Sequence, residues 1–201
     1  MSTTELAARL DVTPASVTGM VRRLHRQGLV EHVPYQGVTL TAAGRQEALR
    51  LVRIHRLWEL FLAKVLGFSW DEVHAEAHGL EHATSERLAD QLAEFLGQPS
   101  TDPHGQQIPS GEGILPLRDS FPLSQVQGGE HVTLVEVPDE DPELLRYLGD
   151  LELYPGTDLQ VVARAPFDGP LTIRVAGGEQ VLGKELATHL LVTYTDMIEG
   201  V

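Results

Sequence analysis

Apolar residues between positions 3 and 96 recur every three or four residues, which is the spacing of amphipathic helices. Thr4 and Thr13 are the predicted N-caps of the first two helices, and Gly28 is the predicted end of the second. Ser69 and Glu72 have the spacing of a capping box, with Ser69 as the N-cap of a further helix. The helices are expected over residues 3–10, 15–27, 42–66, from 69 through the following histidines, and 85–96.

From residue 124 apolar and polar residues alternate in short runs, a pattern typical of strands in a small β-barrel. A loop rich in proline and glycine precedes this part of the chain. We therefore expect a mainly α plus β protein with four successive regions. These regions are 1–46, a winged helix-turn-helix; 47–97, a helical layer; 98–123, a connecting loop; and 124–201, a barrel with strands at 132–137, 159–162 and 171–175 and a helix at 142–148.

The first region has the order helix, short turn, helix and β-hairpin, which typically places a recognition helix in the DNA major groove. Such a hairpin also occurs in small helical domains that do not bind DNA. The residue order ELAARLDVTPASVTGMVRRLHRQGLVEH favours DNA binding. The residues expected to contact bases are Ser16 and Thr18, assisted by Thr13 and Ala15, and those expected to meet phosphates or acidic neighbours are Arg22, Arg23 and Arg26.

Four of the nine histidines lie between residues 55 and 82, interspersed with glutamates. On a helix, His74, His78 and His82 fall on one face, and Glu81 joins it. His55 and Glu59 form a second pair on the preceding helix. Imidazole and carboxylate without sulfur is a ligand set for a borderline or hard divalent ion. An acidic helix with chance histidines is the alternative, and the other five histidines are expected to be surface or structural residues.

The charge distribution and the amino-acid composition limit the classes of function that the chain can have. The net charge is −14, yet residues 1–46 hold five arginines against three acidic residues, a net of +2. A mildly basic head on an acidic body indicates DNA contact by the head alone and a body that attracts cations. The chain has no cysteine, and its apolar runs are too short to span a membrane. We therefore expect a cytoplasmic protein with no membrane partner.

One enzymatic alternative has a definite pattern. His78-Gly79-Leu80-Glu81-His82 is H-x-x-E-H, the signature of a class of zinc metallopeptidases in which the histidines hold zinc and the glutamate activates water. The additional ligands His55, Glu59 and His74 would crowd an open catalytic position, so we expect no enzyme and no small organic substrate. A structural adaptor without metal-dependent DNA binding is a third possibility.

The chain resembles the iron-dependent repressor family, which includes the diphtheria toxin repressor and its manganese-sensing relatives. The resemblance rests on the helix-turn-helix and wing, on HRLWELFLAKVLGFSWDEVHAEAHGLEHATSERLADQL, and on the PHGQQIP loop. It implies that the helical layer mediates dimerisation and that the terminal region is an SH3-like, FeoA-type domain. It also implies a homodimer that binds palindromic operator DNA in response to metal.

The resemblance further implies two metal sites in each subunit. The ancillary site takes His55, Glu59, His74, Glu136 and Asp139, and the primary site takes His78, Glu81 and His82. Family members have a helix before the one that starts at Thr3, which supplies further primary-site ligands, and that helix is expected to be missing from this sequence. Without cysteine or methionine donors in the cluster, the expected signal is Mn(II), with Fe(II) as the alternative and Zn, Co, Ni or Cd as surrogates.

Overall fold

The structure is a computed structural model, and it describes residues 1–33 and 37–195. The chain separates into two compact units, and the division falls within helix α3 (Ala42–Phe61). The first unit is Met1–Val52 with Pro109–Ile114, and the second is Arg53–Ile108 with Leu115–Val201.

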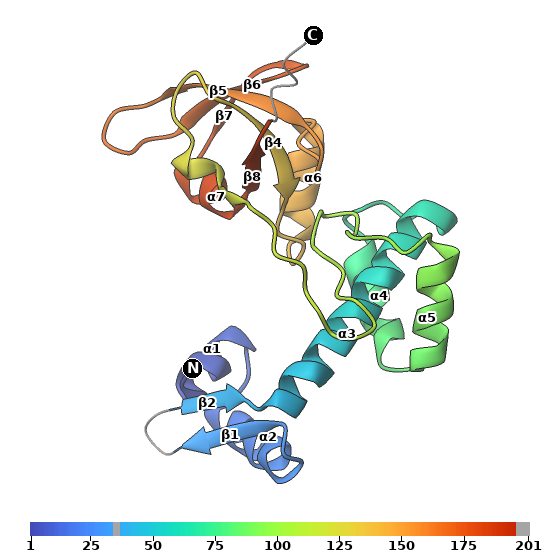
Figure 1. The fold of residues 1–201 in the computed structure, drawn as a ribbon. Coiled ribbons are helices and arrows are strands. Elements are labelled where there is room, and N and C mark those ends of the chain that lie inside the picture. Colours follow the sequence, from blue (N-terminus) through green and yellow to red (C-terminus); the bar gives the residue numbers. More distant parts are fainter. Residues whose placement is uncertain (34–36, 196–201) are drawn as a thin grey trace. The chain divides into compact units, whose positions relative to one another are not determined.

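The first unit holds a helix-turn-helix and a two-stranded hairpin, as predicted (Figure 1). Ala7, Val17, Val21 and Val30 form its small core. The hairpin strands pair antiparallel, with Val30 opposite Leu40. The elements are α1 (Thr3–Arg9), α2 (Pro14–Arg26), β1 (Val30–Val33) and β2 (Gly37–Leu40).

The two N-caps of this unit differ in how well the sequence predicts them. Thr13 caps α2 as expected, because its hydroxyl accepts a hydrogen bond from the Ser16 N–H at 3.2 Å. The prediction of Thr4 for α1 is wrong. Ser2 is the N-cap, and it forms a capping box with Glu5 in which each side chain accepts from the other residue's backbone N–H.

The helical layer of the second unit consists of the end of α3, α4 (Val73–Glu81) and α5 (Glu86–Phe95). The predicted helix over 42–66 is α-helical only to Phe61, and a π-helical turn, η1 (Leu62–Leu66), follows before Gly67 ends it with a positive φ of 74°. Leucine and alanine side chains pack α5 against α3. This core contains Ile54, Leu57, Leu60, Ala89, Leu92 and Ala93.

The prediction of a capping box with Ser69 as the N-cap of α4 is wrong, because the Glu72 N–H donates to the Ser69 carbonyl and not to its hydroxyl. The Ser69 hydroxyl donates to the Glu72 carboxylate at 2.5 Å, yet these residues make a turn, and α4 begins only at Val73 without a side-chain cap. Ser85 does cap α5, accepting from the Leu88 N–H at 3.3 Å.

The rest of the second unit is one six-stranded antiparallel sheet in the order β3-β8-β4-β5-β6-β7, with helices beside it (Figure 1). Leu134, Val161 and Ile173 of the sheet share a fully buried core with Leu145 and Leu148 of α6. Burial of each such side chain contributes roughly 1.5–3 kcal/mol. The elements are β3 (Phe121–Pro122), the 3₁₀ turn η2 (Leu123–Gln125), β4 (His131–Glu136), α6 (Pro142–Asp150), β5 (Asp158–Arg164), β6 (Leu171–Val175), β7 (Gly178–Leu182), α7 (Lys184–His189) and β8 (Leu191–Tyr194).

Within residues 1–33 and 37–195, none of the helices has the length and the apolar character that a membrane span requires.

Candidate metal centre

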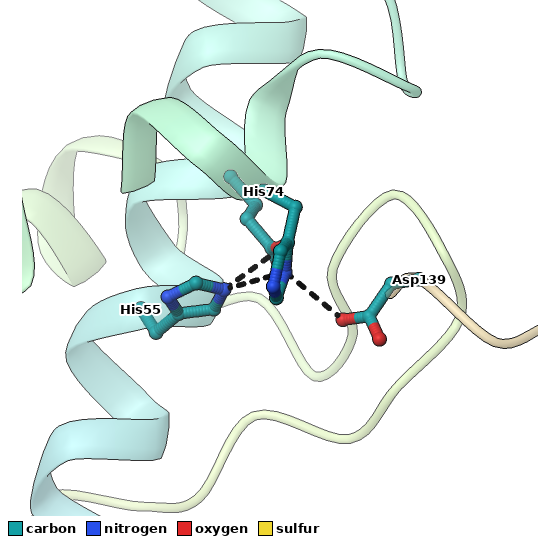
Figure 2. Close-up of side chains that lie close together, drawn as sticks. His55, His74 and Asp139 are labelled. Atoms are coloured by element: carbon teal, nitrogen blue, oxygen red, sulfur yellow. Dashed lines mark hydrogen bonds and ion pairs between the residues drawn. The ribbon is translucent and has the colours of Figure 1, made fainter. Parts of the chain in front are cut away.

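Four predicted ligands meet in the second unit, and they come from three segments. His55 and Glu59 lie one turn apart on α3, His74 is the second residue of α4, and Asp139 follows β4 (Figure 2). His55 Nε2 and His74 Nδ1 lie 3.0 and 3.1 Å from the same carboxylate oxygen, Glu59 Oε1. His74 Nδ1 also lies 3.5 Å from Asp139 Oδ2. One candidate ligand atom from each of the four residues lies within 4.8 Å of the others.

The electrostatics of this group show strong coupling between imidazoles and carboxylates. The hydrogen bonds from His74 to Asp139 and to Glu59 raise the pKa of His74 to about 10. Burial works to raise the pKa of Asp139, but the bond and charge of His74 outweigh it and lower that pKa to about 2. His74 therefore carries a proton in this arrangement, and a metal ion would have to replace that proton.

A second cluster, Glu59, Asp102 and His104, is fully enclosed by protein. Each of its residues has a buried atom without a hydrogen-bond partner: Glu59 Oε2, Asp102 Oδ2 and His104 Nδ1. His104 Nε2 lies 2.7 Å from the Trp70 carbonyl oxygen, so Nε2 carries the proton and Nδ1 presents a bare lone pair. His104 Nδ1 lies 3.9 Å from Glu59 Oε1.

Asp102 is held in place from the backbone of its own loop. Its Oδ1 accepts hydrogen bonds from the N–H groups of His104 at 2.8 Å and Gln106 at 2.9 Å. Its other oxygen, Oδ2, lies 3.6 Å from Arg56 Nε. Burial and the nearby charge of Glu59 raise the pKa of Asp102 to about 8. Buried, unpaired carboxylates and imidazoles are costly, and a cation between them would remove much of that cost.

A third group lies on the more exposed side of α4. His55 Nδ1 approaches Glu81 Oε2 at 2.7 Å, while His78 Nδ1 and His82 Nε2 lie 3.0 and 3.4 Å from Glu81 Oε1. The side chains of His78 and His82 are 70% and 66% exposed, whereas that of Glu81 is 10% exposed. His55 therefore contacts both groups, through one ring nitrogen each.

The structure groups the predicted ligands as the resemblance implies, with one exception. His74 joins Glu59 and Asp139, whereas His78 and His82 lie near Glu81, so the three histidines on one helical face belong to two groups. Glu136 is not a member of any of the three groups found among the described residues. Its nearest recorded ion-pair partner is Arg118, at 4.0 Å.

Sequence reasoning missed Asp102 and His104. We expected His104 to be an isolated surface or structural residue, but its side chain is completely buried beside Glu59. Asp102 and His104 lie in a segment without periodicity, so no spacing in the sequence points to them.

The predicted DNA-contacting residues lie at the start of α2 (Thr13, Ala15, Ser16 and Thr18) and in its second half (Arg22 and Arg23). Thr13, Ala15, Ser16, Arg22 and Arg23 are exposed, and Thr18 is partly so. Two hydroxyls already have protein partners: that of Thr18 donates to the Pro14 carbonyl at 2.8 Å, and that of Ser16 lies 2.9 Å from the Thr13 hydroxyl. A helix with a polar start and basic residues further along is suited to a DNA groove and backbone when it belongs to a helix-turn-helix.

A helix-turn-helix, a helical layer with clustered imidazoles and carboxylates, and a small sheet together define a metal-dependent DNA-binding regulator. Family models agree over almost the whole chain. Residues 1–38 match the iron dependent repressor N-terminal DNA binding domain, residues 41–110 the iron dependent repressor metal binding and dimerisation domain, and residues 121–194 the FeoA domain.

Individual relatives give the same answer. The iron-dependent repressor IdeR of Mycobacterium tuberculosis H37Rv is 34% identical over 188 residues, which cover 88% of this chain and 81% of the relative. The diphtheria toxin repressor of Corynebacterium glutamicum is 30% identical over 167 residues, covering 78% of this chain and 73% of the relative. A manganese-dependent transcriptional repressor in complex with manganese superimposes with a TM-score of 0.89 at 38% identity, covering 97% of this chain and 91% of that one.

The chain belongs to the iron-dependent repressor family. The predicted fold class is thereby confirmed, with a helix-turn-helix domain, a helical dimerisation domain and a FeoA domain. The relatives are transcriptional repressors and not enzymes, which confirms the expectation of no enzyme and weighs against the metallopeptidase alternative for H-x-x-E-H.

Proposed function

We propose that this protein is a homodimeric repressor that binds palindromic operator DNA when Mn(II) occupies both the cluster around Glu59 and a second site around Glu81. The observation that carries the proposal is the convergence of donors from separate segments on one buried carboxylate. Glu59 comes from α3, Asp102 and His104 from the connecting loop, and Asp139 from the end of β4. Among these donors, three buried atoms have no hydrogen-bond partner.

The donor set fits a divalent transition metal. Carboxylate oxygens and neutral imidazole nitrogens, without thiolate or thioether sulfur, suit Mn(II) and Fe(II). His104 donates its other ring N–H to a backbone carbonyl, which is the usual arrangement of a metal-ligating histidine. The residues that would hold the ion fall into two groups that share Glu59, with His55, His74 and Asp139 in one and Asp102 and His104 in the other. Glu136 remains a predicted ligand.

Glu59 is the residue that joins the parts of this cluster. Its Oε1 faces the two helical histidines, and its Oε2 is unpaired beside the loop residues. A bound cation would take the place of the proton on His74 as the positive charge beside Glu59 and Asp139. Asp139 and His104 then fix the FeoA region and the loop against the helical layer through their own side chains. His78, Glu81 and His82 form the second proposed site, and His55 connects it to the first.

The proposal requires a dimer whose two recognition helices enter successive major grooves, about 34 Å apart. Leu88 and Phe95 on α5 are 46% and 68% exposed, and these apolar side chains support a dimer contact through the helical layer. Metal acts by favouring the arrangement that binds DNA over the arrangement that does not. The shift in this equilibrium is set by the difference in metal affinity between the two arrangements. A cytoplasmic location follows from the proposed operator, since the protein must reach the DNA.

Fe(II) is the second candidate signal, because the same nitrogen and oxygen donors accept it. The relatives include proteins described as iron-dependent and as manganese-dependent. A related repressor, ScaR, has been solved with Cd²⁺ and with Zn²⁺, at TM-scores of 0.85 and 0.83. Because divalent affinity generally rises toward zinc, tight binding of Zn or Cd by this chain would not identify them as the signal.

The test is binding to the DNA upstream of the protein's own gene, followed by fluorescence anisotropy under anaerobic conditions. Mn(II), Fe(II) and Zn(II) are titrated separately, and a chelator is added at the end of each titration. We expect DNA binding to appear with Mn(II) and to vanish with chelator. Stronger activation by Fe(II) at equal free metal would favour the iron-responsive alternative. Metal-independent DNA binding would contradict both.

A further inference from the structure

The loop that carries Asp102 and His104 is attached to the end of β4 by its backbone. The Val137 N–H donates to the His104 carbonyl at 3.0 Å. Gly105 has a φ of +82°, and a Cβ at this position would lie 1.9 Å from the Val135 carbonyl oxygen, so a side chain cannot be accommodated without moving the backbone. The loop and the strand are therefore in contact at the residue next to His104.

Arg118 bridges this contact. Its Nη1 donates to the Gly105 carbonyl at 2.7 Å and to the Val135 carbonyl at 3.1 Å. The two carbonyls belong to the loop and to β4, so one guanidinium nitrogen joins both. The Arg118 side chain is 22% exposed, which shields these hydrogen bonds partly from water.

The Arg118 guanidinium also forms an ion pair with Glu136. Arg118 Nη1 lies 4.0 Å from Glu136 Oε2. A lone positive charge beside a cation site would oppose metal binding, and the glutamate counters that effect. This pairing also gives Glu136 a role near the site that does not require it to be a ligand.

We propose that Arg118 is a positioning residue for the metal site, holding the Asp102–His104 loop and the β4 end that precedes Asp139 in one fixed arrangement. The inference rests on the proposed function, because it deepens the account of the same site. Metal ligands need placement to within about 0.5 Å, and loop-borne ligands reach it only when other residues hold them. The hydrogen bonds of Arg118 go to backbone carbonyls and not to the side chains of Asp102, His104 or Asp139, so it acts through the loop and the strand.

The experiment compares Arg118→Met, Arg118→Lys and the wild-type chain, with Arg174→Met as a matched control. Arg174 is an exposed arginine of the same compact unit, paired with Glu179 at 2.6 Å. Mn(II) affinity is measured by the free Mn(II) signal in electron paramagnetic resonance, using Mn(II) alone as the probe. Each variant is also prepared with His78→Ala, to isolate the site around Glu59. Urea unfolding without metal reports on the fold.

We expect Arg118→Met to weaken Mn(II) binding at the Glu59 site by about 10-fold or more, the effect typical of residues that orient metal ligands. Arg118→Lys should recover part of the loss, since an ammonium can donate to one carbonyl but lacks the planar fork. Arg174→Met should bind like the wild type. A merely structural role would lower metal-free stability without a selective loss at this site.

Wild-type Mn(II) affinity in Arg118→Met would overturn the inference while leaving the proposed function intact. If Arg118→Met fails to fold, Arg118→Lys decides, because the inference requires a smaller but measurable loss there too. No Mn(II) binding by the wild-type chain would overturn the proposed function itself, and the inference with it.

Discussion

The ion pair between Asp139 and His74 gives a quantitative prediction for Asp139→Asn, which keeps the shape of the side chain and removes its charge. The pKa of Asp139 falls from 3.8 to about 2, which corresponds to about 2 kcal/mol of folding stability at neutral pH. The pKa of His74 moves further, but His74 also bonds to Glu59 and its side chain is 37% exposed. The shift of Asp139 is therefore the better measure of this one pair.

The pH dependence of this loss has a definite sign. Because the folded pKa of Asp139 is lowered, its stabilisation is present above 3.8 and is lost as the pH falls through about 2. Metal-free Asp139→Asn should therefore be less stable than the wild type by about 2 kcal/mol at pH 7, and the difference should close toward pH 2.

The assay is urea unfolding with a chelator at pH 7 and at several lower pH values, followed by circular dichroism. Asp168→Asn is the control, because Asp168 is 61% exposed in its ion pairs with Arg164 and Lys184, and exposed pairs contribute only about 0–1 kcal/mol. Added Mn(II) should raise the melting temperature of the wild type and the control but much less that of Asp139→Asn. Equal stability and equal Mn(II) response in all three proteins would refute the reasoning.

Three further predictions follow from the geometry. Mn(II) affinity should rise between pH 6.5 and 8.5, because His74 and Asp102, with pKa values of about 10 and about 8, hold protons that the metal must displace. Calorimetry in buffers of different ionisation enthalpy measures the number of protons released on binding. An affinity that does not change with pH would contradict the assignment of these residues as ligands. His78→Ala should abolish metal-dependent DNA binding while Mn(II) still binds at the Glu59 site. An equal loss of Mn(II) binding at both sites would contradict the division of the ligands into two sites. Arg22→Ala should weaken operator binding across sequences and lower the salt slope by about 1, whereas a change confined to one base position would show that Arg22 reads a base.

The helix periods, the helix-turn-helix and the clustering of metal ligands could be predicted from the sequence because each depends on local spacing. The assignment of His74 to one group and of His78 and His82 to another came from the family resemblance, because the spacing of the residues alone does not separate them. Helical spacing places all three histidines on one face, but their carboxylate partners differ. Glu59 and Asp139, from other segments, contact His74, whereas Glu81, on the same helix, contacts the other two.

Asp102 and His104 were beyond prediction for a different reason. They lie in a loop without periodicity, and no sequence spacing places residue 104 beside residue 59. Their position depends on the hydrogen bond from Val137, the positive φ of Gly105 and the two bonds from Arg118. Glu136 and Asp139 are both acidic and three residues apart, and only the path of the backbone after β4 decides which of them reaches His74.

Operator binding by Glu59→Gln in the presence of Mn(II) tests the central claim most directly, since this residue joins the helical histidines to the buried loop cluster. The matched control is Glu47→Gln, because Glu47 is a partly exposed glutamate on the same helix that pairs with Arg50, and circular dichroism verifies folding. The account predicts Mn(II)-dependent, chelator-reversible binding for the wild type and Glu47→Gln, and no Mn(II)-dependent gain for Glu59→Gln. Normal Mn(II) activation of Glu59→Gln, or metal uptake by the wild type without any change in DNA affinity, would contradict it.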